Sequence, residues 1–211
     1  MSGALRLWMA VLLCVLTGAC TTGEGEGWVR SDRLYIEDCW NGPFNLRPTF
    51  FGANPYREES LLIRVQRGDN LQVVSDGLTV VVSDLAAIRD GLLGQPIPVG
   101  LPPGVAPYGI PVSNGGEPVQ VSLGLYLHDT CHAENGTVYS LSGTITFNSL
   151  FSGDPNESEA AERLTDADFE ATFADPRDMA ADGTVDAAST SLVSGHFRFF
   201  FQRGQPAQPF P

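Results

Sequence analysis

A strict alternation of apolar and polar residues is the feature that most constrains the fold of this 211-residue chain. In residues 119–127 every odd position is Val or Leu, whereas the even positions include Gln120, Ser122 and Tyr126. Residues 139–148 repeat the pattern with Ser, Thr and Asn on the polar side. A period of two places alternate side chains on opposite faces of a β-strand. Both segments are therefore expected to be strands with one buried face.

The same alternation recurs along most of the chain and predicts its fold class. Strands are expected at 33–39, 61–67, 71–74, 78–82, 119–128, 139–148, 166–173 and 193–202. The dipeptide Asn135-Gly136 favours a turn, so 119–128 and 139–148 are expected to form a long hairpin. Together these signals predict an all-β protein, an antiparallel β-sandwich of about eight to ten strands.

Two segments depart from the strand pattern. Asp84 to Leu92 is expected to form a turn or two of helix. Residues 91–118 hold seven glycines and seven prolines. Unstructured connections of that length are usually functional or mobile. Because this one also contains apolar residues, it is expected to drape over the core, a role we favour over that of a ligand lid.

The N-terminus has the features of an export signal. Arg6 precedes an uncharged apolar run at 7–16, which is of signal-peptide length and too short to span a membrane. The sequence Leu16-Thr17-Gly18-Ala19-Cys20 resembles the lipobox of bacterial lipoproteins. That resemblance implies cleavage before Cys20 and lipidation of its thiol. An ordinary secretory peptide that leaves Cys20 as a free thiol is the alternative.

The lipobox also implies a domain organisation and a location. A signal peptide, expected as a cleaved N-terminal helix, occupies 1–19, a lipidated cysteine with a flexible tether 20–27, and one β-sandwich domain 28–211. Thr21 in place of Asp resembles the pattern of lipoproteins exported to the outer membrane. The expected location is therefore the outer membrane, facing the periplasm or the cell surface. The run 197–211 resembles the endings of lipoproteins of unknown function from myxobacteria-like species.

The composition is strongly acidic, with 25 Asp and Glu against 12 basic residues and a formal net charge of −13. Such a charge argues against a nucleic-acid partner and against attraction to anionic headgroups. Solubility at a cell surface explains it, and binding of divalent cations is the alternative.

Two cysteines remain for structure once Cys14 leaves with the signal peptide and Cys20 carries lipid. Cys39 and Cys131 are an even pair in an oxidising compartment, so a disulfide between them is predicted. A metal site formed by His128, Cys131 and His132 is the competing interpretation, because imidazole and thiolate are good zinc ligands.

Two acidic segments are candidate cation sites. Asp154 and Asn156 lie in a polar segment that suits calcium but departs from the EF-hand pattern. Asp166, Asp168 and Glu170 are expected on one strand face, about 7 Å apart. This ladder would suit a cation or an acid–base pair. The alternative for the segment around Asp154 is a polar turn. A solvated outer strand face explains the ladder equally well.

No nucleophile, zinc-protease or phosphate-loop motif occurs, so no enzymatic activity is expected. The predicted function is that of a non-catalytic envelope lipoprotein, either a structural module or a binding module whose partner would be a glycan or an envelope protein, with no cofactor other than a possible calcium ion. Candidate contact residues are Trp40, Tyr108 and Phe200, whereas His196 is expected to be an ordinary surface residue. The alternatives are a calcium-stabilised adhesion-type module and a carboxylate-dependent glycan hydrolase.

Overall fold

The computed structural model describes residues 25–56, 59–68, 74–102, 104–105, 113–114, 117–132 and 136–203. The signal peptide with its expected helix, Cys20 and Tyr108 lie outside these residues. Most of the described residues form strands. These are β1 (Gly25–Ile36), β2 (Trp40–Leu46), β3 (Phe50–Tyr56), β4 (Ser60–Gln66), β5 (Asp76–Val82), β6 (Pro96–Gly100), β7 (Ser113–Asn114), β8 (Glu117–Pro118), β9 (Val121–Leu127), β10 (Thr137–Ser149), β11 (Leu164–Ala174) and β12 (Thr190–Phe200).

The helices in the described ranges are all short. They are α2 (Leu85–Gly91), α3 (His128–Cys131) and the 3₁₀ turns η1 (Ala161–Arg163), η2 (Pro176–Asp178) and η3 (Ala187–Ser189). The helix expected at Asp84 to Leu92 is confirmed as α2, and Asp84 caps it by accepting a hydrogen bond from the Ala87 N–H at 2.9 Å. Among these residues no helix has the length and apolar character needed to cross a membrane.

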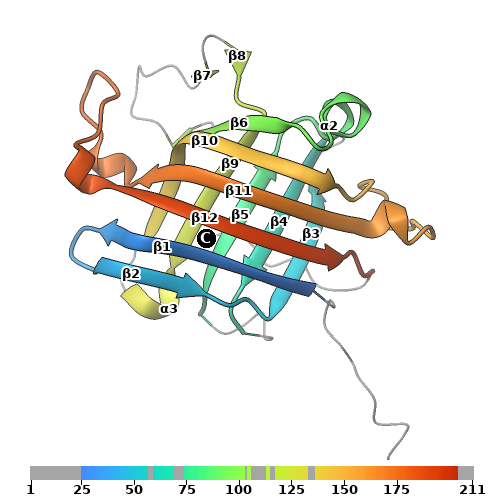
Figure 1. Cartoon of the computed structure of the whole chain (residues 1–211), viewed down its shortest axis with the longest axis horizontal. Coiled ribbons are helices and arrows are strands. Elements are labelled where there is room, and N and C mark those ends of the chain that lie inside the picture. The colour runs from blue at the N-terminus through green and yellow to red at the C-terminus, as the bar shows by residue number, and fades with distance from the viewer. Residues whose placement is uncertain are drawn as a thin grey trace, which may run out of the picture.

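Ten strands form one continuous sheet, in the order β2-β1-β12-β11-β10-β6-β9-β5-β4-β3. The sheet curls strongly, so that β1, β12 and β11 cross in front of β9, β5 and β4 (Figure 1). The β-rich class is confirmed. The purely antiparallel arrangement is wrong, because β6 and β9 pair in parallel and make the sheet mixed. The described strands join into this single curled sheet rather than into two separate ones, apart from the small β7–β8 pair.

The core lies inside the curl and is built from the apolar side of each alternating strand. Its bulkiest fully buried side chains all come from the last third of the chain, namely Phe147, Phe151, Phe173, Phe197 and Phe199. Phe51 of β3 stacks against Phe199 of β12, with ring centroids 5.8 Å apart. This contact packs the edge strand of one half of the sheet against the other half.

The Gly/Pro-rich segment is not entirely a connection, because Pro96–Gly100 forms β6. Its burial alternates, with Ile97 and Val99 buried and both prolines exposed. β6 pairs with β9 only from Val99 onward, so the part that holds the prolines has β10 as its single partner strand. Proline is tolerated where one side of a strand is unpaired.

The hairpin predicted around Asn135-Gly136 is much shorter than expected. β9 and β10 pair through three residue pairs, between Thr137↔Tyr126 and Tyr139↔Gly124. The helix α3 occupies part of the connection. Beyond that point β6 takes the place of β9 beside β10, while β11 pairs along the other edge of β10 from Tyr139 onward.

Candidate functional site

The outer face of β10, β11, β12 and β1 is polar, and strand register brings its side chains together. Asp168 of β11 lies between Thr146 of β10 and His196 of β12. His196 in turn lies beside Trp28 of β1, and Asp166 lies beside Arg198. We call Asn148, Asp166, Asp168, His196 and Arg198 the outer array.

Hydrogen bonds link the members of the outer array. The Nδ1 atom of His196 is 3.0 Å from Oδ1 of Asp168. The Asn148 amide donates to Oδ1 of Asp166 and to Oδ2 of Asp168, each at 3.2 Å. One ligand atom from each of Asp166, Asp168 and His196 lies within 4.8 Å of the others. The array therefore gathers donors and acceptors from three strands at one place.

Arginine partly balances the charge of the array. The Nε atom of Arg198 is 3.6 Å from Oδ2 of Asp166, and another guanidinium nitrogen is 4.0 Å from Glu26. Exposed ion pairs of this kind contribute little to stability, about 0–1 kcal/mol. The Asp168 side chain is 61% exposed. The outer array is therefore accessible to a ligand.

The chemistry of the outer array suits two kinds of ligand. Two carboxylates and an imidazole are donors for a cation of the zinc type, whereas calcium prefers a shell of oxygen atoms. A cation would displace the Asn148 amide and compete with Arg198 for the carboxylates. Carboxylate, amide and imidazole groups also pair with hydroxyl groups, and this use leaves the existing contacts largely in place.

Glu170 does not join the other two carboxylates of the predicted ladder. It lies beside Thr144 and Ser194 and lines a separate shallow depression of about 590 Å³. The other lining residues are Arg30, Ser31, Asp32, Arg33, Thr190, Leu192 and Ser194. Asp166 and Asp168 do not line this depression. Asp166 and Asp168 therefore belong to the outer array, whereas Glu170 belongs to a separate surface depression.

In the segment around Asp154, predicted as a candidate calcium site, side-chain oxygens accept hydrogen bonds from backbone N–H groups of the same segment. Oδ1 of Asp154 accepts a hydrogen bond from the Asn156 N–H at 2.8 Å, and Glu157 accepts one from the Glu159 N–H at 2.9 Å. The first of these bonds defines an Asx turn. These contacts are those of the polar turn that was the alternative to calcium binding.

The predicted aromatic contacts differ in exposure. Trp40 is partly buried and packs against the core, and its indole N–H donates to the Gly42 carbonyl at 3.2 Å. Phe200, at the end of β12, is 36% exposed. Only Phe200 of these two presents an open aromatic surface.

Cys39 and Cys131 are paired as a disulfide, with Cα atoms 5.3 Å apart. The bond joins the turn after β1 to α3, and it removes the thiolate that a metal site at Cys131 would need.

The buried carboxylate of Asp76 also holds α3 in place. It accepts hydrogen bonds from the Asp129 and Thr130 N–H groups at 3.1 and 2.9 Å and from the Thr130 hydroxyl at 2.5 Å.

A second polar cluster is buried beside α3. The Tyr126 hydroxyl donates to Oε1 of Gln66 at 2.9 Å, and burial raises the pKa of Tyr126 to about 12. Burial also lowers the pKa of Arg64 and of His128. The Nε2 atom of Gln66 is buried without a hydrogen-bond partner. Arg64 and Gln66 alternate with apolar residues in the sequence, yet both are buried.

Sequence reasoning missed two members of the outer array. His196 was expected to be a plain surface residue, and Asn148 was assigned only to the polar side of a strand. The alternating pattern gives the face on which each residue lies. It gives no register between strands, so nothing in the sequence placed His196 opposite Asp168.

Comparisons of the chain with protein-family models, with curated proteins and with solved structures found no match.

Proposed function

We propose that this chain is a lipid-anchored module of a bacterial cell envelope, held in the outer membrane, that binds an envelope glycan without catalysis. The anchor is supported by Cys20 and the lipobox-like residues before it. The observation that carries the binding role is the outer array. It is an exposed, hydrogen-bonded set of carboxylate, amide, imidazole and guanidinium groups on the outer face of β10, β11 and β12.

The polarity of this surface favours a polyhydroxyl ligand over a protein. Protein interfaces have an apolar, aromatic core within a polar rim. The large apolar side chains that are exposed in the described part of the chain are few and scattered, namely Val74, Leu93, Leu192 and Phe200. None of them belongs to the outer array. Sugar hydroxyl groups, in contrast, need paired donors and acceptors of the type that Asn148, Asp168 and His196 supply.

The binding role is tested by retention on immobilised envelope polysaccharide. Asp168→Ala and His196→Ala should each weaken retention, because each removes one partner of the bonded pair at the centre of the array. Asp90→Ala removes an exposed carboxylate from α2 instead and should leave retention unchanged. Equal retention of all variants would overturn the glycan assignment. Release of shorter saccharides by the unmodified protein would replace binding with hydrolysis.

The anchor is tested separately by the intact mass of membrane-purified protein, with and without reductant and alkylation. We expect a chain that begins at Cys20 and carries acyl groups, with Cys39 and Cys131 alkylated only after reduction. An unacylated chain would contradict the anchor.

A metal-stabilised adhesion module is the second candidate, favoured by the close approach of the ligand atoms of Asp166, Asp168 and His196. Under this candidate, a chelator lowers the melting temperature of the protein, and added calcium or zinc restores it. Asp166→Asn combined with Asp168→Asn would abolish that response. A melting temperature indifferent to chelator and to both cations removes the candidate.

A further inference from the structure

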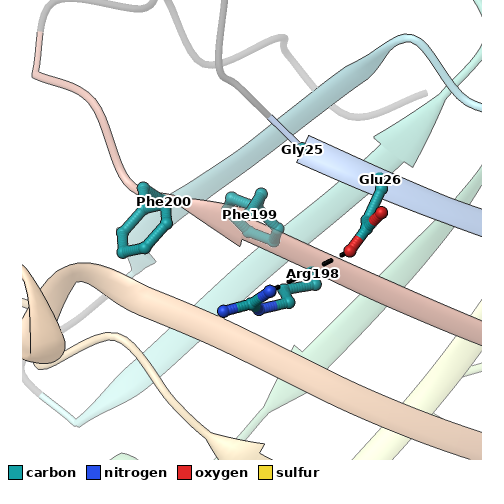
Figure 2. Close-up of a pocket in the computed structure, with 5 residues that line it drawn as sticks. All are labelled: Gly25, Glu26, Arg198, Phe199 and Phe200. Atoms are coloured by element: carbon teal, nitrogen blue, oxygen red, sulfur yellow. Dashed lines mark ion pairs between the residues drawn. The ribbon is translucent and has the colours of Figure 1, made fainter.

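The start of β1 and the end of β12 lie side by side at one end of the sheet. Gly25 is opposite Phe199 in the register of these antiparallel strands. Phe200, Arg198 and Glu26 line a depression of about 250 Å³ at this place, and Figure 2 shows their side chains. We call Gly25, Glu26, Arg198 and Phe200 the tether end, because β1 connects there to the segment that follows Cys20.

The chain between Cys20 and Gly25 is too short to carry the folded part far from its anchor. Five residues span at most roughly 18 Å when fully extended. β1 alone has 12 residues and covers roughly 36 Å. A lipid on Cys20 therefore keeps the tether end close to the bilayer, while the opposite end of β1 approaches the membrane only if the module lies on its side.

The carboxylates of β11 disfavour that sideways orientation. Asp166, Asp168 and Glu170 lie along one outward face of β11. An anionic leaflet repels carboxylates and attracts basic groups within about a Debye length. An upright module keeps Asp168 and Glu170 away from the headgroups, while Asp166 stays beside the guanidinium of Arg198.

The tether end has side chains that suit a membrane interface. Phe200 is an exposed aromatic residue, and Arg198 presents a guanidinium whose side chain is 48% exposed. Aromatic and arginine side chains are the usual partners of headgroups and of the acyl boundary. The next residue, Phe201, stacks on Phe151 with ring centroids 4.0 Å apart, so Phe200 projects from a well-packed strand end.

From this geometry we infer that the tether end is a membrane-contacting surface. Phe200 inserts among the lipid headgroups, Arg198 lies at their level beside Glu26 and Asp166, and the sheet stands upright with Asn148, Asp168 and His196 of the outer array open to the envelope space. The inference rests on the proposed lipid anchor and adds to it an orientation and a lipid-binding residue.

The test uses the full acylated chain in vesicles of phosphatidylethanolamine and phosphatidylglycerol with brominated acyl chains, which quench nearby tryptophan. Phe200→Trp places a reporter at the tether end. Leu192→Trp places a matched reporter at the other end of β12, since Leu192 is 59% exposed and lies on the same face roughly 26 Å away. Emission of the unmodified protein supplies the background of the native tryptophans.

We expect brominated lipid to remove most of the emission added by Phe200→Trp and little of that added by Leu192→Trp. Glu26→Trp, on the neighbouring strand, repeats the measurement should the first variant fold poorly. Equal quenching at the two ends, or stronger quenching at Leu192→Trp, would overturn the orientation.

Intact mass and vesicle flotation distinguish a failure of the orientation from a failure of the lipid anchor. An acylated, floating protein with unquenched Phe200→Trp refutes the orientation alone, whereas an unacylated chain refutes the anchor and the orientation with it.

Discussion

At the end of the sheet that carries α3, a buried polar residue holds the helix in place through hydrogen bonds. Asp76 is fully buried, and its carboxylate accepts three hydrogen bonds from α3 while Arg67 lies 3.7 Å away. A helix of four residues has too few internal hydrogen bonds to persist alone. α3 therefore depends on this carboxylate and on the disulfide at Cys131.

Asp76→Ala should lower the free energy of unfolding by about 1–3 kcal/mol, because it leaves three partly buried donors of α3 without their acceptor. Urea denaturation measures the change. Asp32→Ala, at an exposed position of β1, is the matched control and should change stability by less than about 0.5 kcal/mol. A loss as small as that of the control would show that α3 is held by other contacts.

The burial of Tyr126 predicts an alkaline loss of stability. Because its pKa is about 12 in the folded protein against about 10 in an unfolded chain, the folded state binds the phenolic proton more tightly. The contribution of the Tyr126 hydroxyl to the free energy of unfolding is complete below pH 10. It falls by about 2–3 kcal/mol as the pH rises to 12.

Tyr126→Phe removes this dependence but also removes the hydrogen bond to Gln66, at a cost of about 1 kcal/mol near neutral pH. The stability advantage of the unmodified protein should therefore shrink between about pH 10 and pH 12. Denaturation curves across that window measure it. Parallel pH profiles for the two proteins would contradict the burial argument.

At the scale of elements, alternation in the sequence predicts strands well but not how they pair. The segment expected at 166–173 is β11 (164–174), and the one expected at 193–202 is β12 (190–200). Both faces of each strand also follow from the pattern. The pairing of His196 with Asp168 depends on the register between β11 and β12, which alternation does not give for two strands separated by a long connection. For that reason the carboxylates of the outer array were predictable and its imidazole was not.

The segment Pro96–Gly100 and the polar face of β4 show a second limit. Proline and glycine content predicted a connection at β6, yet the short apolar alternation of Ile97 and Val99 inserts it between β10 and β9. In β4, Arg64 and Gln66 have the pattern of a solvated face and are buried. In both places tertiary packing overrides the local signal.

Close packing around β12 makes one glycine indispensable. A Cβ at Gly195 would overlap the ring of Phe169 and lie 2.9 Å from the Trp28 carbonyl oxygen. Gly195→Ala should therefore lower the free energy of unfolding by about 1–3 kcal/mol. Gly42→Ala on β2 is the control, since nothing lies within 4 Å of its Cβ position, and it should be almost neutral. Equal effects in thermal denaturation would mean that β12 is loosely packed.

At the scale of the whole molecule, the curl of the sheet lets two halves share one core. The strands β2, β1, β12, β11 and β10 face β9, β5, β4 and β3 across buried aromatic and aliphatic side chains (Figure 1). Phe51 and Phe199 stack across this interior and are almost completely buried. One cooperative unfolding transition is expected, because neither half buries its apolar face without the other.

Phe51→Ala tests this dependence. It should lower the free energy of unfolding by about 3–5 kcal/mol, through lost burial and the cavity left against Phe199, while a single transition is retained. Phe200→Ala is the control: it removes the same side chain from the exposed face of β12 and should change stability little. Urea denaturation followed by fluorescence and by far-ultraviolet circular dichroism measures both. If Phe51→Ala instead separated the two signals into distinct transitions, the halves of the sheet would be independently stable and the shared core would not be what holds the fold together.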